Sequence, residues 1–522
     1  MSSHFKLKQK QRTQSFKKTM TRERSVSKRR QFIIQLSKNK KEQNLYRRRQ
    51  KLQNDFLKSQ FENFENQNGN IPALIKLHYQ KNDLVSVSNL IKQLEEKLGS
   101  VDEIREIAQQ LEEENLYPYL ISLIEKESNV VLCSNSLSIL TSIGSTIPKM
   151  LPYFIAQGLL EKSIKVLKIA PLQINSIRCI GHIVSNLEDG NEFFLLKIIV
   201  QLFIEIFEET QKIKIKRETL WCFSCFLSRR PLPDFDDYKE FLPYVYKSIY
   251  EKDEEILIDT FNILASITTD KENIQTIIDS ADISHSINLL SHKSHGVQSA
   301  VVKLIGNIVS GTDEQTDYVI KLSVLPGLVS LLSNEKSFLR RQACWVCSNI
   351  LCQKVHIPTV SDYGIIKLLQ DIIKNDFFDV KREAIFCFSK IFTLSEPGFI
   401  LKITTKKLIK RLMQFFDIED QQLIYLVLKI FRDYLVVGND SYQINNLEEN
   451  VSLTLLEENN VFKKIEKLIS HKNQQICYLS RQIIDWVIEN QIEIDMSEEM
   501  IEQPLSFDIN TPLQIINTMN KK

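Results

Sequence analysis

Apolar residues recur at the three- or four-residue spacing of amphipathic helices over most of this chain. One helical pattern returns at intervals, and its clearest copies are RETLWCFSCFL from Arg217, RRQACWVCSNIL from Arg340 and KREAIFCFSKIF from Lys381. Weaker copies are NSIRCIGHIV from Asn175, IDTFNILASI from Ile258 and SAVVKLIGNIV from Ser299. The same helix is therefore expected once in each of several successive units.

Equivalent positions in these copies are separated by 43, 40, 42, 42 and 41 residues. They are Arg178, Trp221, Phe261, Lys303, Trp345 and Phe386. A period of about 40 to 47 residues is typical of armadillo and HEAT repeats, whose units stack into a solenoid. We therefore predict an all-α fold, an armadillo-repeat right-handed superhelical solenoid behind an N-terminal basic helical tail. Small residues three places further along should let neighbouring helices approach closely: Gly181, Ser224, Gly306, Ser348 and Ser389.

Composition supports a helical fold and argues against a membrane protein. Glycine and proline number only 13 each among 522 residues, which is too few for the many tight turns of a β-sandwich or barrel. No stretch approaches the roughly 18 consecutive apolar residues of a membrane span, and the N-terminus lacks the apolar run of a secretory signal. We expect no membrane association and a location in the cytoplasm and nucleus.

Four segments can be distinguished along the chain. Residues 1–51 form a basic tail, 52–70 a polar linker, 71–490 an array of about ten repeats, and 491–522 an acidic, loosely ordered tail. Within the array, residues 440–459 interrupt the period, and an inserted helix or loop is expected there.

The N-terminal 51 residues are strongly basic, whereas the rest of the chain is acidic overall. Residues 1–51 contain 18 of the 67 Lys and Arg but only 2 of the 65 Asp and Glu, so the remainder holds 49 basic and 63 acidic residues. Such a tail suits a nucleic-acid arm, a membrane-surface segment or a docking segment for an acidic groove. It contains no interleaved stacking aromatics and no RNP or helix-turn-helix signature, so nothing beyond charge favours direct nucleic-acid binding.

The segment IQLSKNKKEQNLYRRR, residues 34–49, resembles the importin-beta-binding domain of importin-alpha proteins. The resemblance implies a basic helix wrapped by importin-beta, and a nearby basic cluster that folds back as a pseudo-substrate. The implied importin-beta contacts are Lys28, Arg29, Arg30, Leu36, Lys38, Lys40 and Lys41. The implied autoinhibitory residues are Arg47, Arg48 and Arg49.

Importin-alpha proteins bind nuclear localisation signals along a groove lined by the third helix of each repeat, using Trp-x-x-x-Asn pairs. The i,i+4 spacing places the Asn amide and the indole on one helix face, where they can hold peptide backbone and lysine stems. Repeats six to eight resemble the family's minor patch, with Lys303 in place of Arg, Phe386 in place of Trp and Lys390 in place of Asn. The implied peptide-binding residues are Lys303, Asn307, Val309, Asp313, Thr316, Trp345, Asn349, Glu383 and Phe386.

The family's major patch is eroded in this sequence. Its counterparts on repeats three and four are Arg178, His182, Trp221 and Cys225, and Asn186 stands where the family has a lysine-binding Asp. An Arg without an acid in a lysine slot repels a basic peptide, so we predict weak or absent binding of simple basic signals there. A lone Trp on an apolar helix is usually a core residue, and we assign Trp486 to the core.

No motif for catalysis or cofactor binding was found. The sequences GxxxxGK[ST], GxGxxG, GxSxG and HExxH do not occur, so we expect no enzyme activity, no catalytic residues and no cofactor. Two CxxC pairs, Cys222 with Cys225 and Cys344 with Cys347, could in principle form a zinc site. They lie three repeats apart, where a solenoid keeps them separate, so we expect no metal.

The resemblance implies a nuclear import adaptor that shuttles through the nuclear pore between cytoplasm and nucleus. Its partners would be importin-beta, cargo proteins with nuclear localisation signals and an export receptor at the C-terminal repeats. One alternative is an armadillo scaffold for a single dedicated partner, with general cargo binding lost. A second is an RNA-binding tail protein, which would bind RNA with a steep salt dependence.

Overall fold

A computed structural model describes residues 71–125, 129–186, 196–210, 212–445 and 450–496. Within these ranges every regular element is an α-helix or a short 3-10 helix. The all-α prediction is confirmed for this part of the chain. The predicted tail and linker, residues 1–70, lie outside the described residues.

The described chain divides into two units by packing. The first contains residues 71–350 together with 360–368, and the second contains residues 351–359 together with 369–496. The division between the units falls within two helices, α21 (Ile357–Asp362) and α22 (Ile365–Asn375), each of which has residues assigned to both units.

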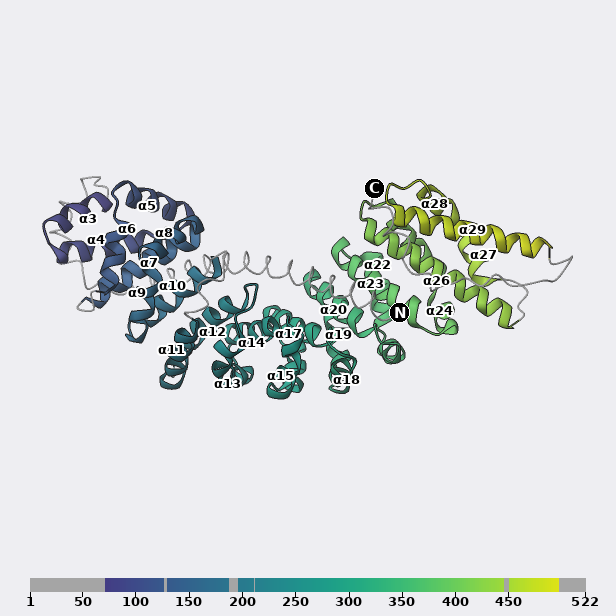
Figure 1. Ribbon diagram of the computed structural model, residues 1–522, viewed down its shortest axis with the longest axis horizontal. Coiled ribbons are helices and arrows are strands. Elements are labelled where there is room, and N and C mark those ends of the chain that lie inside the picture. The colour runs from purple at the N-terminus through teal and green to yellow at the C-terminus, as the bar shows by residue number, and fades with distance from the viewer. Residues whose placement is uncertain (1–70, 126–128, 187–195, 211, 446–449, 497–522) are drawn as a thin grey trace, which may run out of the picture. The chain divides into compact units, whose positions relative to one another are not determined.

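In the first unit, the third helices of successive repeats pack on one another in chain order (Figure 1). They are α4 (Leu84–Lys97), α7 (Val130–Thr146), α10 (Gln173–Asn186), α12 (Ile213–Leu227), α14 (Glu254–Ile267), α17 (His295–Ile308) and α20 (Ser337–Ile350). The other α-helices described between residues 71 and 350 are α3 (Ile71–Gln80), α5 (Val101–Glu113), α6 (Tyr117–Ser122), α8 (Leu151–Ala156), α9 (Leu159–Lys165), α11 (Leu196–Glu209), α13 (Leu242–Lys247), α15 (Glu272–Ser280), α16 (Ile283–Asn288), α18 (Asp313–Lys321) and α19 (Val324–Leu332).

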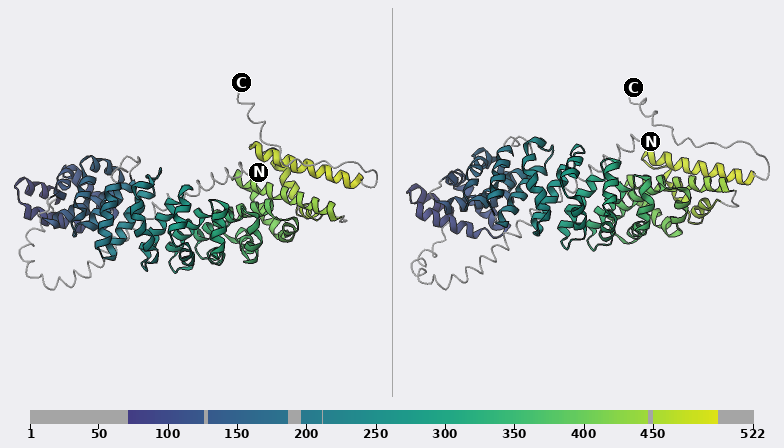
Figure 2. Two further views of the ribbon diagram at one scale, coloured as in Figure 1. Left: turned by 60° about the horizontal axis from the view of Figure 1, so that its bottom comes forward. Right: turned by 90° about the horizontal axis from the view of Figure 1, so that it is seen from below.

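The second unit repeats this arrangement. Its third helices α23 (Phe378–Leu394), α26 (Gln421–Asn445) and α29 (Gln474–Met496) also pack in chain order, and Figure 2 shows α26 and α29 side by side. The helices between them are α24 (Pro397–Ile403), α25 (Lys406–Leu412), α27 (Val451–Glu458) and α28 (Val461–Leu468).

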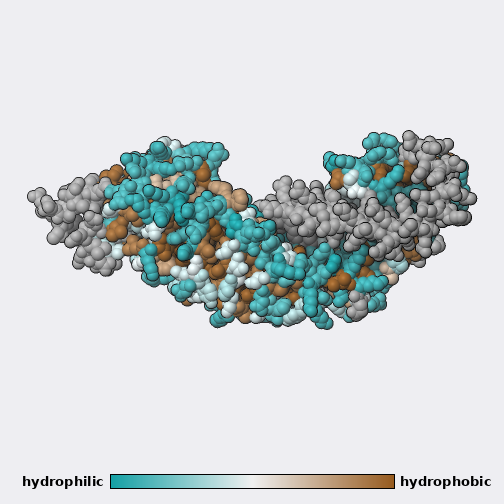
Figure 3. Space-filling model, turned by 180° about the vertical axis from the view of Figure 1, so that it is seen from behind, coloured by the Kyte–Doolittle hydropathy of each residue, from teal (hydrophilic) through white to brown (hydrophobic). Residues whose placement is uncertain are grey.

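Within a unit, an inner third helix is buried on two sides because it packs between the third helices before and after it. In α14, Leu257, Phe261 and Leu264 share one face at i,i+4 and i,i+3 spacing, and all three are buried. The same helix contacts α12 and α17. Hydrophilic residues alternate with hydrophobic patches on the face of the molecule drawn in Figure 3.

No single helix in the described ranges is long and apolar enough to cross a membrane. The pair Val130–Thr146 and Pro148–Ala156, bent by 117°, meets a criterion of length and composition only when its two helices are taken together.

Helix starts are tied to the preceding repeat by a shared carboxylate. Asp253 caps α14 by accepting hydrogen bonds from the backbone of Glu255 and Ile256, each 3.1 Å, and it also accepts from Arg217 Nε of α12 at 2.8 Å. In the second unit, Asp420 likewise caps α26 and pairs with an arginine of α23. One side chain therefore accepts from backbone N–H groups that have no partner within the helix, and it also joins two repeats.

The segment 440–459, where an inserted helix or loop is expected, falls on two helices and on residues 446–449, which lie outside the described residues. Residues 440–445 continue α26, which is 25 residues long, and α27 is the first helix of the next repeat. Elsewhere in the second unit, hydrogen bonds between adjacent repeats join residues about one ordinary period apart, as between Arg411 and Gln370, which are 41 residues apart. The hydrogen bond from Asn473 to Gln421 joins residues 52 positions apart. The lengthened helix accounts for the irregular period. The expected end of the array near Asn490 is also too early, because α29 continues to Met496.

Replacing Asp253 with Ala should destabilise the first unit by about 2 kcal/mol, because the cap of α14 and the partner of Arg217 are lost together. The measurement is the urea midpoint of the full chain. Asp236, an exposed acid paired with Lys239, offers the control. An Asp253→Ala midpoint no lower than that of Asp236→Ala would contradict the role of the shared carboxylate.

Candidate functional site

Trp345 lies at the junction of α17 and α20, and its ring fills the space left by Gly306. A Cβ atom at position 306 would lie 1.9 Å from Trp345 Cζ3, which is closer than any real contact. The ring is 1% exposed. Glycine is therefore needed at 306 to receive the indole of the following repeat, rather than to let two helix backbones approach, as the sequence suggested.

The two asparagines of this surface make the same contact one repeat apart. Asn349 Nδ2 donates to the Gly306 carbonyl of the preceding third helix at 3.3 Å. Asn307 Nδ2 donates to the Ala265 carbonyl of α14 at 2.6 Å and to Thr268 Oγ1 at 3.2 Å. Both are buried. The preceding repeat thus orients each amide and leaves the Oδ1 side of the group available as an acceptor.

Asn307 and Lys303 are one turn apart on α17, and Lys303 is partly exposed. The loop after α17 leads into α18 through a capping box in which Thr312 and Gln315 bond reciprocally. Asp313 is exposed in the first turn of α18, where the helix dipole favours a negative charge.

Val309 and Thr316 are buried beneath this loop. Thr316 Oγ1 donates to the carbonyls of Val309 at 3.3 Å and Thr312 at 3.2 Å. These bonds hold the loop in place, so the position of Thr316 suits support of the surface more than direct contact with a ligand.

Glu383 and Phe386 belong to the second unit. They lie one turn apart on α23, and both are buried at 6% and 7% exposure. Lys390, in the Asn position, is partly exposed one turn further along the same helix.

The four residues of the eroded patch meet at the junction of α10 and α12. A Cβ atom at Gly181 would lie 2.4 Å from Trp221 Cζ3, so this glycine receives an indole as Gly306 does. The His182 ring centroid lies 4.9 Å from that of Trp221. Cys225 is buried one turn beyond Trp221.

The expectation that Arg178 lacks an acidic neighbour is wrong. Its guanidinium donates to the carboxylate of Glu218 on α12, and the two side chains are only 17% and 16% exposed. Glu218 was missed in the sequence, although it precedes Trp221 by three positions, as Glu383 precedes Phe386. Alignment of RETLW with REAIF could have identified it.

Asn186 ends α10, and its Nδ2 donates to the His182 carbonyl at 2.8 Å. This bond is local to the end of its own helix.

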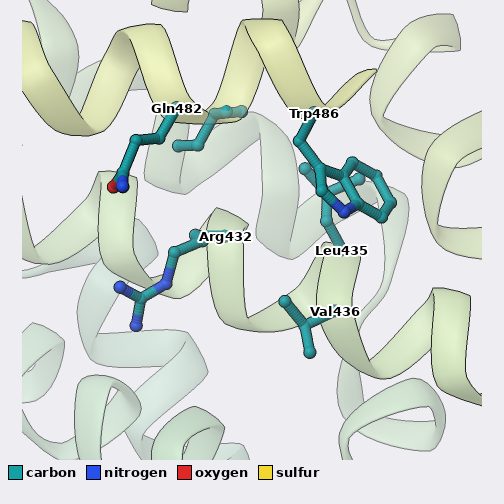
Figure 4. Close-up of a pocket in the computed structure, with 6 residues that line it drawn as sticks. Arg432, Leu435, Val436, Gln482 and Trp486 are labelled. Atoms are coloured by element: carbon teal, nitrogen blue, oxygen red, sulfur yellow. The ribbon is translucent and has the colours of Figure 1, made fainter. Parts of the chain in front are cut away.

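Trp486 is buried on α29, which confirms its assignment to the core. Figure 4 shows its ring beside Leu435 and Val436 of α26, where these residues line a small pocket with Arg432 and Gln482.

The two CxxC pairs occupy separate helices, α12 and α20, with α14 and α17 stacked between them. None of these four cysteines forms a disulfide, and all four are buried; burial raises the pKa of Cys347 to about 12. Among the described residues, no three His, Cys, Asp or Glu side chains gather as metal ligands would.

The importin-beta contacts and the autoinhibitory residues predicted in residues 28–49 lie outside the described residues.

Comparison with known proteins agrees with this arrangement. The sequence pattern of the Armadillo/beta-catenin-like repeat matches residues 312–351. Importin subunit alpha-3 of Arabidopsis thaliana is 25% identical over 501 residues, 92% of this chain and 93% of that protein. Importin subunit alpha-1a of Oryza sativa subsp. japonica is 26% identical over 321 residues, so the matched region spans 60% of each chain.

The fold also resembles a crystal structure of an engineered protein. The TM-score is 0.65 at 15% sequence identity, with 80% of this chain and 99% of that chain covered. Together with the matching repeat pattern, this likeness confirms the armadillo-repeat fold.

Replacing Gly306 with Ala should force the Trp345 ring out of its position and cost about 1–3 kcal/mol of stability through overpacking. Gly398 is the matched control, because it also lies in a helix but nothing lies within 4 Å of an added Cβ atom. Urea unfolding of both variants measures the difference. Equal midpoints for Gly306→Ala and Gly398→Ala would show that the ring does not depend on the glycine.

Proposed function

Because this chain is a divergent member of the importin-alpha family, we propose that it is a nuclear import adaptor. It binds basic nuclear localisation signals on its third helices and links the cargo to importin-beta through its N-terminal basic segment. It acts by binding, without catalysis, and it shuttles between cytoplasm and nucleus.

The observation that carries this proposal is the double attachment of Trp345 and Asn349 to Gly306. The ring packs over this glycine and the amide donates to its carbonyl. Both groups are therefore held in fixed positions by the previous repeat before any peptide arrives. Such preorganisation lowers the entropy that binding would otherwise cost.

A peptide would be held by two kinds of contact. The amide nitrogens of Asn307 and Asn349 already donate hydrogen bonds to the preceding repeat. Their Oδ1 atoms can therefore accept hydrogen bonds from backbone N–H groups of an extended peptide. The indole of Trp345 can cover the aliphatic stem of a lysine, and Asp313 provides negative charge for its ammonium group.

Peptide binding requires these side chains to become accessible, since Trp345 is 1% and Asn349 3% exposed in the full chain. We assign competition for this surface to Arg47, Arg48 and Arg49. Importin-beta, by binding the residues from Lys28 to Lys41, would remove the competitor and favour cargo binding. An export receptor at the C-terminal repeats would complete the cycle.

One observation favours the alternative of a scaffold with a dedicated partner. At the junction of α10 and α12, Arg178 and Glu218 already satisfy each other, so this patch cannot read a simple basic signal in the family's usual way. A scaffold would bind no such signal at either patch.

The proposal predicts that a lysine-rich signal peptide binds the full chain and binds more tightly after removal of residues 1–51. Asn349→Ala should weaken binding roughly ten- to a hundredfold, because a buried hydrogen-bonding side chain is lost. Fluorescence anisotropy with a labelled peptide measures both effects.

Ser348→Ala is the control for that substitution, because Ser348 is the neighbouring residue and its hydroxyl donates to the Trp345 carbonyl of its own helix, 2.7 Å away. Absence of binding with and without residues 1–51 would favour the scaffold. If the tail binds RNA and importin-beta does not compete with that RNA, the result would favour the RNA-binding tail protein.

A further inference from the structure

A cation, an acid and an aromatic ring meet at the junction of α10 and α12. Arg178 and His182 come from one helix, and Glu218 and Trp221 from the next. The guanidinium of Arg178 bonds to the Glu218 carboxylate, and the imidazole lies against the indole. This is the set of groups that a pocket for a basic side chain contains, except that the basic side chain belongs to the protein itself.

We propose that Arg178 is a built-in substitute for a cargo lysine, and that it determines the peptide specificity of the third and fourth repeats by occupying a cation slot. The inference rests on the proposed function, since it assumes that basic peptides are the ligands. It goes further because it assigns the lost specificity to one residue that can be changed.

The charges explain why an occupied slot excludes a basic peptide. Glu218 has one ion-pair partner within the described residues, and that partner is Arg178. A lysine entering beside this pair would meet a carboxylate that is already neutralised and a guanidinium of like charge. Without Arg178, the same carboxylate is left mostly covered and unpaired, a state that an incoming ammonium group would relieve.

Packing alone does not account for the pair. The ring of Trp221 is received by Gly181, so its position does not depend on the guanidinium. Arg217, the neighbour of Glu218 in sequence, is directed instead to Asp253 of α14. Two adjacent residues of α12 thus pair with different repeats: Glu218 with Arg178 of the preceding repeat, and Arg217 with Asp253 of the following repeat.

The test measures binding of a labelled lysine-rich peptide to the full-length chain by anisotropy. Arg178→Gln should bind roughly tenfold more tightly than the parent, because the Glu218 carboxylate, left without Arg178, gains a charged hydrogen-bonding partner from the peptide. The double variant Arg178→Gln/Glu218→Gln should return to the parental affinity. Arg178→Lys, which keeps the charge, should show no gain.

The matched control is Arg217→Gln, which removes one positive charge from α12, beside Glu218, but not from the slot. A gain of the same size in this variant would overturn the proposal, because it would show a general electrostatic effect. No gain in Arg178→Gln would overturn it as well. Thermal melting shows whether each variant is folded, and Arg178→Met serves as a second uncharged variant with the same expected gain.

All variants are also measured in an Asn349→Ala background. A loss of binding from the parent to Asn349→Ala tests the proposed function at repeats six and seven. A gain from Asn349→Ala to Arg178→Gln/Asn349→Ala tests the slot independently of those repeats. Failure of one comparison leaves the other intact, so the two proposals can be rejected separately.

Discussion

Within each of the two units, burial of third helices against one another is the constraint on which this structure depends. A single repeat cannot cover its own apolar face, so stability comes from the junctions between repeats. At two junctions the burial is carried by a large indole placed over a glycine, Trp221 on Gly181 and Trp345 on Gly306. The glycines are therefore part of the packing and set where the rings lie.

The polar groups of the candidate surface are anchored by the same junctions. Asn307 and Asn349 each bond to a carbonyl of the previous third helix, and Arg178 bonds to a carboxylate of the following one. The residues that we propose as peptide contacts thus also connect adjacent repeats. A substitution at such a position changes binding and stacking together, which explains why stability has to be measured beside affinity.

The two patches have diverged in opposite directions under this constraint. At repeats six and seven, a buried indole and two buried amides hold the previous repeat. At repeats three and four, an arginine and a glutamate satisfy each other across the junction. Both arrangements stabilise the stack, but in our proposal only the first leaves functional groups for a ligand.

Sequence alone determined the repeat length, the helical class and the relation to a family, because periodicity and composition are local properties of the chain. It also located Trp345 and Asn349 from their spacing on one helix. It did not determine the pairing of Arg178 with Glu218, because residues 40 positions apart are brought together only by stacking. Nor could it show that Gly181 and Gly306 pack against indole rings. A glycine in a sequence does not reveal whether a helix backbone or a side chain fills the space beside it. The end of α26 is a related case: a change of period does not reveal whether the extra residues form a loop or lengthen a helix.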